Sequence, residues 1–359
     1  MLTLEVKNFG PLKDINIELN KTNLFIGENG SGKSVLAKLI TIVTSLNKYS
    51  ENLIEEFEKL DINFITEKTY IKYTDSSDEH ILFTIDKKEV KFSEEVLETI
   101  SNLKKSKEIL SSFTNPNNIP IDGLLSKRWI SQYIPADRNL ISIFNKSIYN
   151  LFASDIPLPK HILNFGAQYE KAKNEINNLD VLGMTFRFEN GQDKIYYDED
   201  NFLPLENSSS GIQTALPLYL TVKYFNKKHN DIIIEEPEQN LYPKAQADTT
   251  KFIIENSSEN IYLMTHSPYI LSTLNILLFA YKASNKNDIL KEKISKFIPV
   301  FQQINPDEFS AYFIRDGVSE SIKGKSTGLI SENAIDEVGD IIDDEFNQLM
   351  EIYREFKND

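Results

Sequence analysis

The sequence predicts an α/β protein whose largely parallel β-sheet is flanked by helices, and three observations lead to this fold class. Short apolar strands alternate with longer helical segments through the second half of the chain, as they do in parallel sheets. An apolar run at 23–26 leads through a glycine-rich loop into a helical segment that starts at 33. The run Ile232-Ile233-Ile234 is typical of a strand that is buried on both faces.

The N-terminal third mixes short strands with helices. Residues 2–9 and 15–19 alternate apolar and polar positions around a Gly10-Pro11 turn, which predicts a hairpin. The elements expected next are, in chain order, a strand at 23–26, a helix at 33–49, a charged helical stretch at 51–60, strands at 69–74, 80–85 and 89–92, a helix at 94–112 and a loop at 113–123.

The remaining two thirds predict strand–helix units. A core strand near 129–136 comes first, and a helical insertion at 138–179 follows it. Two strands at 184–189 and 194–197 then flank a turn that contains Asn190-Gly191. A helix at 212–228 precedes three closing units, which are 231–234 with 243–255, 261–264 with 268–283, and 309–314 with 333–356.

Composition excludes several classes of protein. The chain of 359 residues is 40% hydrophobic and 26% charged, which is ordinary for a globular protein. It has no cysteine, so disulfides and thiolate zinc sites are excluded. No apolar run reaches eighteen residues and the N-terminus has no signal-peptide pattern. We therefore expect a cytoplasmic protein without a membrane span.

The net charge of −15 disfavours contact with nucleic acid, because an acidic surface repels phosphate backbones. DNA or RNA binding would need local basic patches. The alternative for each lysine group is the solvated face of a helix. The candidate groups are Lys104, Lys105 and Lys107; Lys223, Lys227 and Lys228; and Lys291, Lys293 and Lys296.

The glycine-rich loop matches the pattern G-x-x-x-x-G-K-S in full. In such loops, backbone N–H groups surround a phosphate and the following helix adds the positive end of its dipole. Lys33 can reach the terminal phosphates, and the Ser34 hydroxyl can hold Mg²⁺. A glycine turn that ends in Lys-Ser by chance is the alternative, but the strand before it and the helix after it favour a nucleoside triphosphate site. The predicted nucleotide ligands are Gly27, Asn29, Gly30, Ser31, Gly32, Lys33 and Ser34.

Two carboxylates follow the strand at 231–234. The carboxyl ends of parallel strands form the ligand crevice, so Glu235 and Glu236 should lie beside the glycine loop. Triphosphate hydrolysis needs one acidic group for Mg²⁺ and another that orients or deprotonates water. We assign Glu235 to the metal and Glu236 to the water, with an ordinary acidic turn as the alternative.

A histidine and a serine cluster are further candidates. His266 follows the strand at 261–264 and can donate a hydrogen bond to a γ-phosphate, although a structural histidine is equally consistent. Ser209, Ser210 and Gly211 stand at a predicted helix start, where N–H groups and hydroxyls bind anions. An ordinary serine N-cap fits that position as well.

Taken together, these motifs resemble the ABC-type ATPases, in particular the RecF/SMC/OLD-like branch. The segments that carry the resemblance include 6–12, the glycine loop, 133–138, 209–213, 232–243 and 265–271. The resemblance implies an ATPase that uses ATP and Mg²⁺, with Lys33 on the phosphates, Glu236 as catalytic base and His266 as the switch histidine. It also implies a homodimer in which the serine cluster covers the γ-phosphate bound by the partner subunit.

The same resemblance implies a domain division and a biological role. We expect an ABC-type P-loop NTPase head at 1–50 and 184–315, a mainly helical inserted lobe at 51–183 that includes the short antiparallel strands, and a C-terminal helical tail at 316–359. Stand-alone heads of this branch resemble ATPases that control an effector, such as a nuclease or toxin encoded nearby, in bacterial anti-phage defence. The alternative is a RecF-like DNA-repair ATPase that binds DNA directly.

Overall fold

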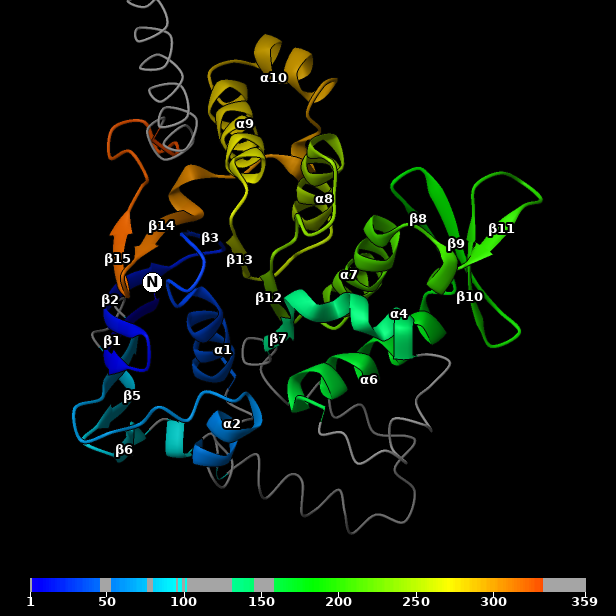
Figure 1. Ribbon diagram of the computed structural model, residues 1–359. Helices are drawn as coiled ribbons and strands as arrows, with labels where there is room; N and C mark the ends of the chain where they lie inside the picture. The colour runs from blue at the N-terminus through cyan, green and yellow to red at the C-terminus, as the bar shows by residue number, and fades with distance from the viewer. Residues whose placement is uncertain are drawn as a thin grey trace, which may run out of the picture.

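The computed structural model describes residues 2–45, 53–75, 80–94, 96–98, 101, 131–144 and 158–331. These residues form one large mixed β-sheet with helices on both faces, and a small antiparallel sheet beside it (Figure 1). The large sheet has the order β6-β5-β4-β1-β2-β15-β14-β3-β13-β12-β7. The predicted α/β class is confirmed.

One half of the large sheet is parallel, as predicted. Its five strands lie in the order β14 (Phe309–Arg315), β3 (Thr22–Ile26), β13 (Ile261–Thr265), β12 (Asp231–Glu235) and β7 (Ser131–Ile134). In this register Ile26, the last residue of β3, lies opposite Thr265 on one side and Phe313 on the other. The carboxyl ends of these strands therefore meet at one edge of the sheet.

The other half of the large sheet is mostly antiparallel, and it corrects the expected lobe boundary. We expected the strands near 69–92 in the inserted lobe, yet β4 pairs along β1 from Leu2↔Asp75 to Lys7↔Tyr70 and so joins the main sheet. Alternation identifies a half-buried strand, but it does not specify the sheet edge that the strand extends. The strands of this half are β6 (Glu89–Phe92), β5 (His80–Asp86), β4 (Tyr70–Asp75), β1 (Leu2–Phe9), β2 (Leu12–Leu19) and β15 (Val318–Ser321).

Side chains of the parallel strands alternate between two buried cores. Ile232 and Ile234 of β12 belong to the core beneath helices α7 (Ser210–Lys227), α8 (Pro243–Glu255) and α9 (Pro268–Ser284). Ile233 between them belongs to the opposite core, which α1 (Lys33–Val43) covers. Burial on both faces explains why this strand reads as an unbroken apolar run.

The small sheet consists of β11 (Phe202–Pro204), β10 (Gln192–Tyr196), β9 (Met184–Glu189) and β8 (Asn178–Val181). Asn190 and Gly191 connect β9 to β10 with φ angles of 54° and 74°, as a two-residue hairpin turn with positive φ at both positions requires. Because β8 pairs with β9, this unit starts at 178, inside the segment that we expected to be helical. Helix α6 (Lys160–Glu175) packs against α7.

The other elements are short. They are α2 (Leu53–Lys59), η5 (Ala136–Asn139), α4 (Leu140–Phe144), η6 (Leu205–Asn207), α10 (Asp288–Ser295), η7 (Val300–Gln302) and η8 (Pro306–Glu308). Helix α1 ends at Val43, earlier than the expected 49. Helix α10 was not predicted; it is two turns long and none of its residues is fully buried, although Ile294 packs against the core.

Several expectations lie outside the described residues. These are the loop at 113–123, the helix at 333–356 and most of the helix at 94–112. The expected C-terminal tail instead contributes a strand at its start, because β15 lies between β2 and β14. In the part of the chain that the structure describes, none of the helices has the length and apolar character needed to span a bilayer.

Candidate functional site

The glycine loop lies at the carboxyl edge of the parallel strands, between β3 and α1. Gly30 and Gly32 have φ angles of 77° and 103°, a backbone region that residues with a side chain rarely adopt. A Cβ on Gly27 would stand 2.2 Å from the carbonyl oxygen of Ile314 on β14. The loop therefore needs glycine at these positions both for its turn and for its close contact with the neighbouring strand.

Lys33 closes the glycine loop from inside. Its ammonium donates to the carbonyl oxygens of Gly27 at 2.7 Å and Glu28 at 2.8 Å, and to Ser31 Oγ at 3.3 Å. Burial lowers the pKa of Lys33 to about 8, although nearby carboxylates, that of Glu236 foremost, act in the opposite direction. This cation therefore lies at the loop in an environment with little water, where its attraction for an anion is strong.

Glu235 ends β12 beside the glycine loop. Glu235 is 5% exposed, and the hydroxyls of Tyr133 and of Ser34, the residue after Lys33, act on its carboxyl and favour the charged form. Burial raises the pKa of this carboxyl. Its Oε1 has no hydrogen-bond partner within the described part of the chain. The structure thus brings together the two residues that the sequence assigned to the metal.

The donor set of Ser34 and Glu235 fits Mg²⁺. A buried carboxylate oxygen without a partner, next to an exposed hydroxyl, suits an ion that takes most of its ligands from phosphates and water. Among the described residues, no group of three histidine, aspartate or glutamate side chains could hold a metal. The protein share of the coordination would therefore come from these two side chains.

Glu236 and His266 face one another across neighbouring strand ends. His266 Nε2 lies 3.6 Å from Glu236 Oε1. Burial and the charge of Lys33 lower the pKa of His266, so the ring is mainly neutral at pH 7. Glu236 has a φ of 44°, a left-handed conformation that is uncommon outside glycine and clusters at functional sites.

Comparison with known proteins identifies the family. A family model described as "AAA ATPase domain" matches residues 1–127 and 56–271, which together span more than half of the chain. The chain belongs to the AAA ATPase domain family. It is therefore an ATPase, and the glycine loop is its P-loop. No curated protein matches this ATPase.

The solved structures that match this chain include head domains of SMC proteins and an ATP-binding cassette of an ABC transporter. The SMC head domain from Thermotoga maritima is 13% identical, with a TM-score of 0.41, and the match covers 89% of this chain and 97% of that one. An SMC head bound to the C-terminal winged-helix domain of ScpA is 15% identical, at 0.38, with 89% and 96% covered. An ABC transporter's ATP-binding cassette in its ADP conformation is 13% identical, at 0.38, with 93% and 94% covered.

Two residues of this ATPase organise the site and were not among the predicted site residues. Glu238 Oε1 accepts hydrogen bonds from Thr265 Oγ1 at 2.8 Å and from the His266 backbone N–H at 2.7 Å. Arg138 donates to main-chain carbonyls at the end of β12. Both residues belong to motifs that carry the resemblance, but a motif does not tell which side chains turn back to hold the backbone.

The serine cluster stands at the N-terminus of α7. Ser209 caps α7, because its Oγ accepts the Ile212 N–H at 3.5 Å. Ser209 and Ser210 are exposed, and a Cβ on Gly211 would stand 3.1 Å from the Asn240 carbonyl oxygen. No hydrogen bond among the described residues joins this cluster to the P-loop. One chain of this ATPase thus exposes the cluster without directing it to its own phosphate site.

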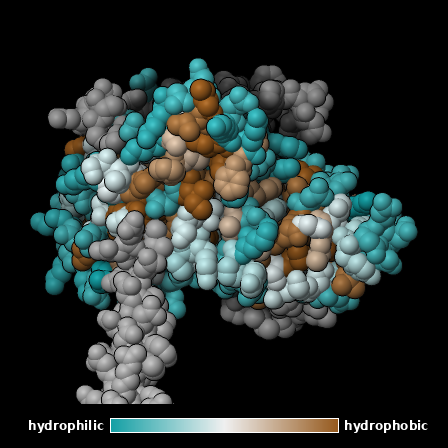
Figure 2. All heavy atoms as spheres, turned by 90° about the horizontal axis from the view of Figure 1, so that it is seen from above, coloured by the Kyte–Doolittle hydropathy of each residue, from teal (hydrophilic) through white to brown (hydrophobic). Residues whose placement is uncertain are grey.

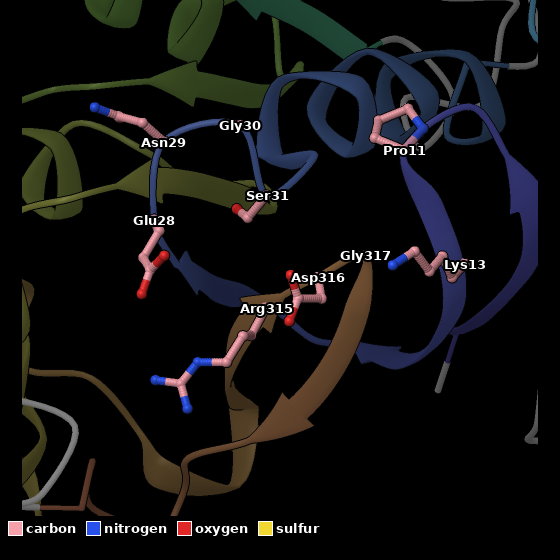
Figure 3. A pocket seen from close by; sticks show the side chains of 9 residues that line it. All are labelled: Pro11, Lys13, Glu28, Asn29, Gly30, Ser31, Arg315, Asp316 and Gly317. Carbon is pink, nitrogen blue, oxygen red and sulfur yellow. The ribbon is translucent and has the colours of Figure 1, made fainter.

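A pocket of about 280 Å³ opens beside the P-loop (Figure 3). Its walls are the P-loop residues Glu28 to Ser31, the β1–β2 turn with the first residues of β2, and the end of β14 with the turn that follows it. The two turns are locked together, because the backbone N–H of Lys13 donates to the Gly317 carbonyl at 2.8 Å. The pocket was not predicted from sequence, since its walls lie about 300 residues apart in the chain. It has room for nucleotide atoms that extend beyond the phosphates.

Proposed function

We propose that ATP joins two copies of this ATPase into a dimer, and that the cycle of binding and hydrolysis controls an effector protein. One observation carries the proposal. Lys33, Glu236 and His266 gather at the P-loop edge, whereas the serine cluster at the start of α7 is exposed and, among the described residues, forms no hydrogen bond with the P-loop. A γ-phosphate bound at the P-loop would be covered on one side only.

The residues at the P-loop edge suit hydrolysis in a definite way. Lys33 and the loop N–H groups hold the terminal phosphates, and Ser34 with Glu235 would hold Mg²⁺, which neutralises the developing phosphate charge when bound. Glu236 accepts a proton from the attacking water. The neutral imidazole of His266 has a single N–H donor, which would donate to the γ-phosphate from its place beside the Glu236 carboxylate.

The serine cluster of the second copy would complete the site. Helix α7 is 18 residues long, so its N-terminus presents unpaired N–H groups and the positive end of the helix dipole to an anion. Contacts of this kind require the γ-phosphate and are lost when it leaves. The dimer is therefore expected to form with ATP and to separate after hydrolysis.

An exposed apolar patch supports the effector part of the proposal. Apolar side chains gather on the upper face of the molecule (Figure 2), the side on which α9 and α10 lie in Figure 1. Contiguous exposed apolar side chains mark protein docking sites. A nuclease or toxin that functions in anti-phage defence is the partner that the motif resemblance suggests. The large apolar and aromatic side chains at 268–302 that are at least half exposed are Tyr269, Ile276, Phe279, Ile289, Phe297, Val300 and Phe301.

The dimer is tested by sedimentation velocity of the Glu236→Gln variant with and without ATP and Mg²⁺. We expect an ATP-dependent dimer, because the amide keeps the shape of the side chain but cannot take the proton from water. Adding Ser209→Arg should dissolve the dimer without loss of ATP binding. Ser258→Arg, an exposed serine outside the site, is the matched control and should leave the dimer intact. An oligomeric state that is the same with and without ATP would refute the proposal.

The effector role is tested by co-expression with the products of adjacent genes. A complex that forms or dissociates with ATP, and that is weakened by Phe279→Asp on the apolar patch, would support the effector role. DNA-stimulated hydrolysis that falls steeply with salt would instead support the DNA-repair alternative.

A further inference from the structure

Arg138 is a buried cation whose hydrogen-bond partners, among the described residues, are all main-chain carbonyls. It lies in η5, directly after β7, and its exposed fraction is 0%. Its guanidinium donates from Nε to Thr214 O at 3.2 Å, from Nη1 to Pro135 O at 3.1 Å and to Glu235 O at 2.8 Å, and from Nη2 to Glu236 O at 2.7 Å. One side chain thus connects β7, α7 and the acidic turn after β12.

Only arginine can satisfy this arrangement of acceptors. Its five donors form a rigid planar fork, whereas lysine offers donors on a single nitrogen. Burial lowers the pKa of Arg138 to about 10, so the side chain stays charged at pH 7. Burial of a cation costs free energy unless its donors are paired. These four hydrogen bonds offset that cost and hold the carbonyls of the acidic turn in place.

The held backbone is that of Glu236. This residue has the left-handed φ of 44°, which costs free energy for a side chain with a Cβ and persists only where the surroundings impose it. Its N–H donates to Met264 O at 2.8 Å, and its carbonyl accepts from Arg138. Both peptide groups of Glu236 are therefore fixed, one to β13 and the other to the guanidinium.

The Arg138 guanidinium also binds the helix that carries the serine cluster. Thr214, whose carbonyl accepts from Arg138, lies one turn into α7. Its Oγ1 donates to Ser210 O at 2.9 Å and accepts from Asn240 Nδ2 at 3.1 Å. The start of α7 and the acidic turn therefore share one hydrogen-bond network.

We propose that Arg138 is a positioning residue for hydrolysis, which orients the Glu236 carboxylate by holding the Glu236 carbonyl against the scaffold of β7 and α7. The inference rests on the proposed role of Glu236. The positioning role predicts that loss of the Arg138 hydrogen bonds slows the chemical step and leaves the binding of ATP unchanged. The reason is that the P-loop and Lys33 form no hydrogen bond with Arg138 in the described part of the chain.

The test is a double-variant cycle on ATP hydrolysis by the full-length protein. In Arg138→Lys and Arg138→Met, we expect kcat to fall about 10- to 100-fold, since small misplacements of a reacting group have effects of this size. The ATP Kd should stay within about twofold. In the Glu236→Gln background, with residual hydrolysis followed over hours with radiolabelled ATP, the same substitutions should cause no further fall. Leu218→Ala, buried on α7, is the packing control, which should lower Tm but leave kcat within about twofold.

The outcomes separate the two proposals. Arg138 variants with the parent kcat, or with an equal further fall in the Glu236→Gln background, would overturn the positioning role. Parental kcat in Glu236→Gln alone would overturn the role of Glu236 itself. Arg138→Lys keeps the charge, so it carries the test if Arg138→Met does not fold.

Discussion

ATP binding should weaken as the pH rises through 8, because Lys33 loses its proton in this range. Burial lowers the pKa of Lys33 to about 8 in the protein without nucleotide. Bound phosphates favour the protonated amine, so nucleotide raises this pKa, and binding above pH 8 must take up a proton. The affinity is therefore constant below the free pKa and falls above it.

The magnitude follows from the titration of one group. With a free pKa of about 8, roughly 90% of Lys33 is protonated at pH 7 and roughly 10% at pH 9. If the neutral amine contributes nothing, the affinity for ATP falls about tenfold between these pH values, or about 1.4 kcal/mol. The short contacts of the ammonium with Gly27 O and Glu28 O indicate that the group that titrates is the one that lies at the phosphate site.

The assay is isothermal titration calorimetry with a slowly hydrolysed ATP analogue between pH 7 and 9.5. Buffers with different ionisation enthalpies count the proton that is taken up. Lys33→Arg is the control, because a guanidinium stays charged throughout this range and should remove the pH dependence. An affinity that is flat across pH 7–9.5, or an equal decline in Lys33→Arg, would show that Lys33 does not titrate as described.

Two further predictions concern stability and the P-loop. Burial raises the pKa of Asp231 to about 7, above its unfolded value, so the free energy of unfolding should fall as the pH rises from about 4 to about 7 and stay low above pH 7. At pH 8, Asp231→Asn should therefore raise Tm, with a gain in the free energy of unfolding of at most about 4 kcal/mol. At pH 4 the same substitution should not raise Tm. A pH-independent difference in Tm would contradict this. Gly27→Ala should abolish ATP binding, since its Cβ would stand 2.2 Å from the Ile314 carbonyl oxygen. The control is Gly166→Ala, in open space on α6, which should leave ATP binding unchanged and stabilise the folded protein by up to about 1 kcal/mol. Parental ATP affinity in Gly27→Ala, measured by the same calorimetry, would contradict the steric argument.

The sequence by itself was enough for the parallel core and its loop. Strands such as β12 and β13 are buried on both faces, so they appear as apolar runs whatever lies around them. The P-loop motif carries much of its own geometry, because Gly30 and Gly32 are required by the positive φ angles of the loop itself, although Gly27 is required by its contact with the distant Ile314. The convergence of Ser34, Glu235, Glu236 and His266 then followed from the rule that parallel strands end at one edge.

Only the tertiary structure decided which distant segments meet. The strands near 69–92 belong to the main sheet because β4 pairs with β1. The apolar and polar pattern of a strand does not specify which strand it pairs with. Arg138 donates to the carbonyl oxygens of Glu235 and Glu236, which come 97 and 98 positions later in the chain. The pocket beside the P-loop needs turns from both ends of the chain. Local periodicity is set by neighbouring residues, whereas these contacts depend on the path of the whole chain, which no short segment specifies.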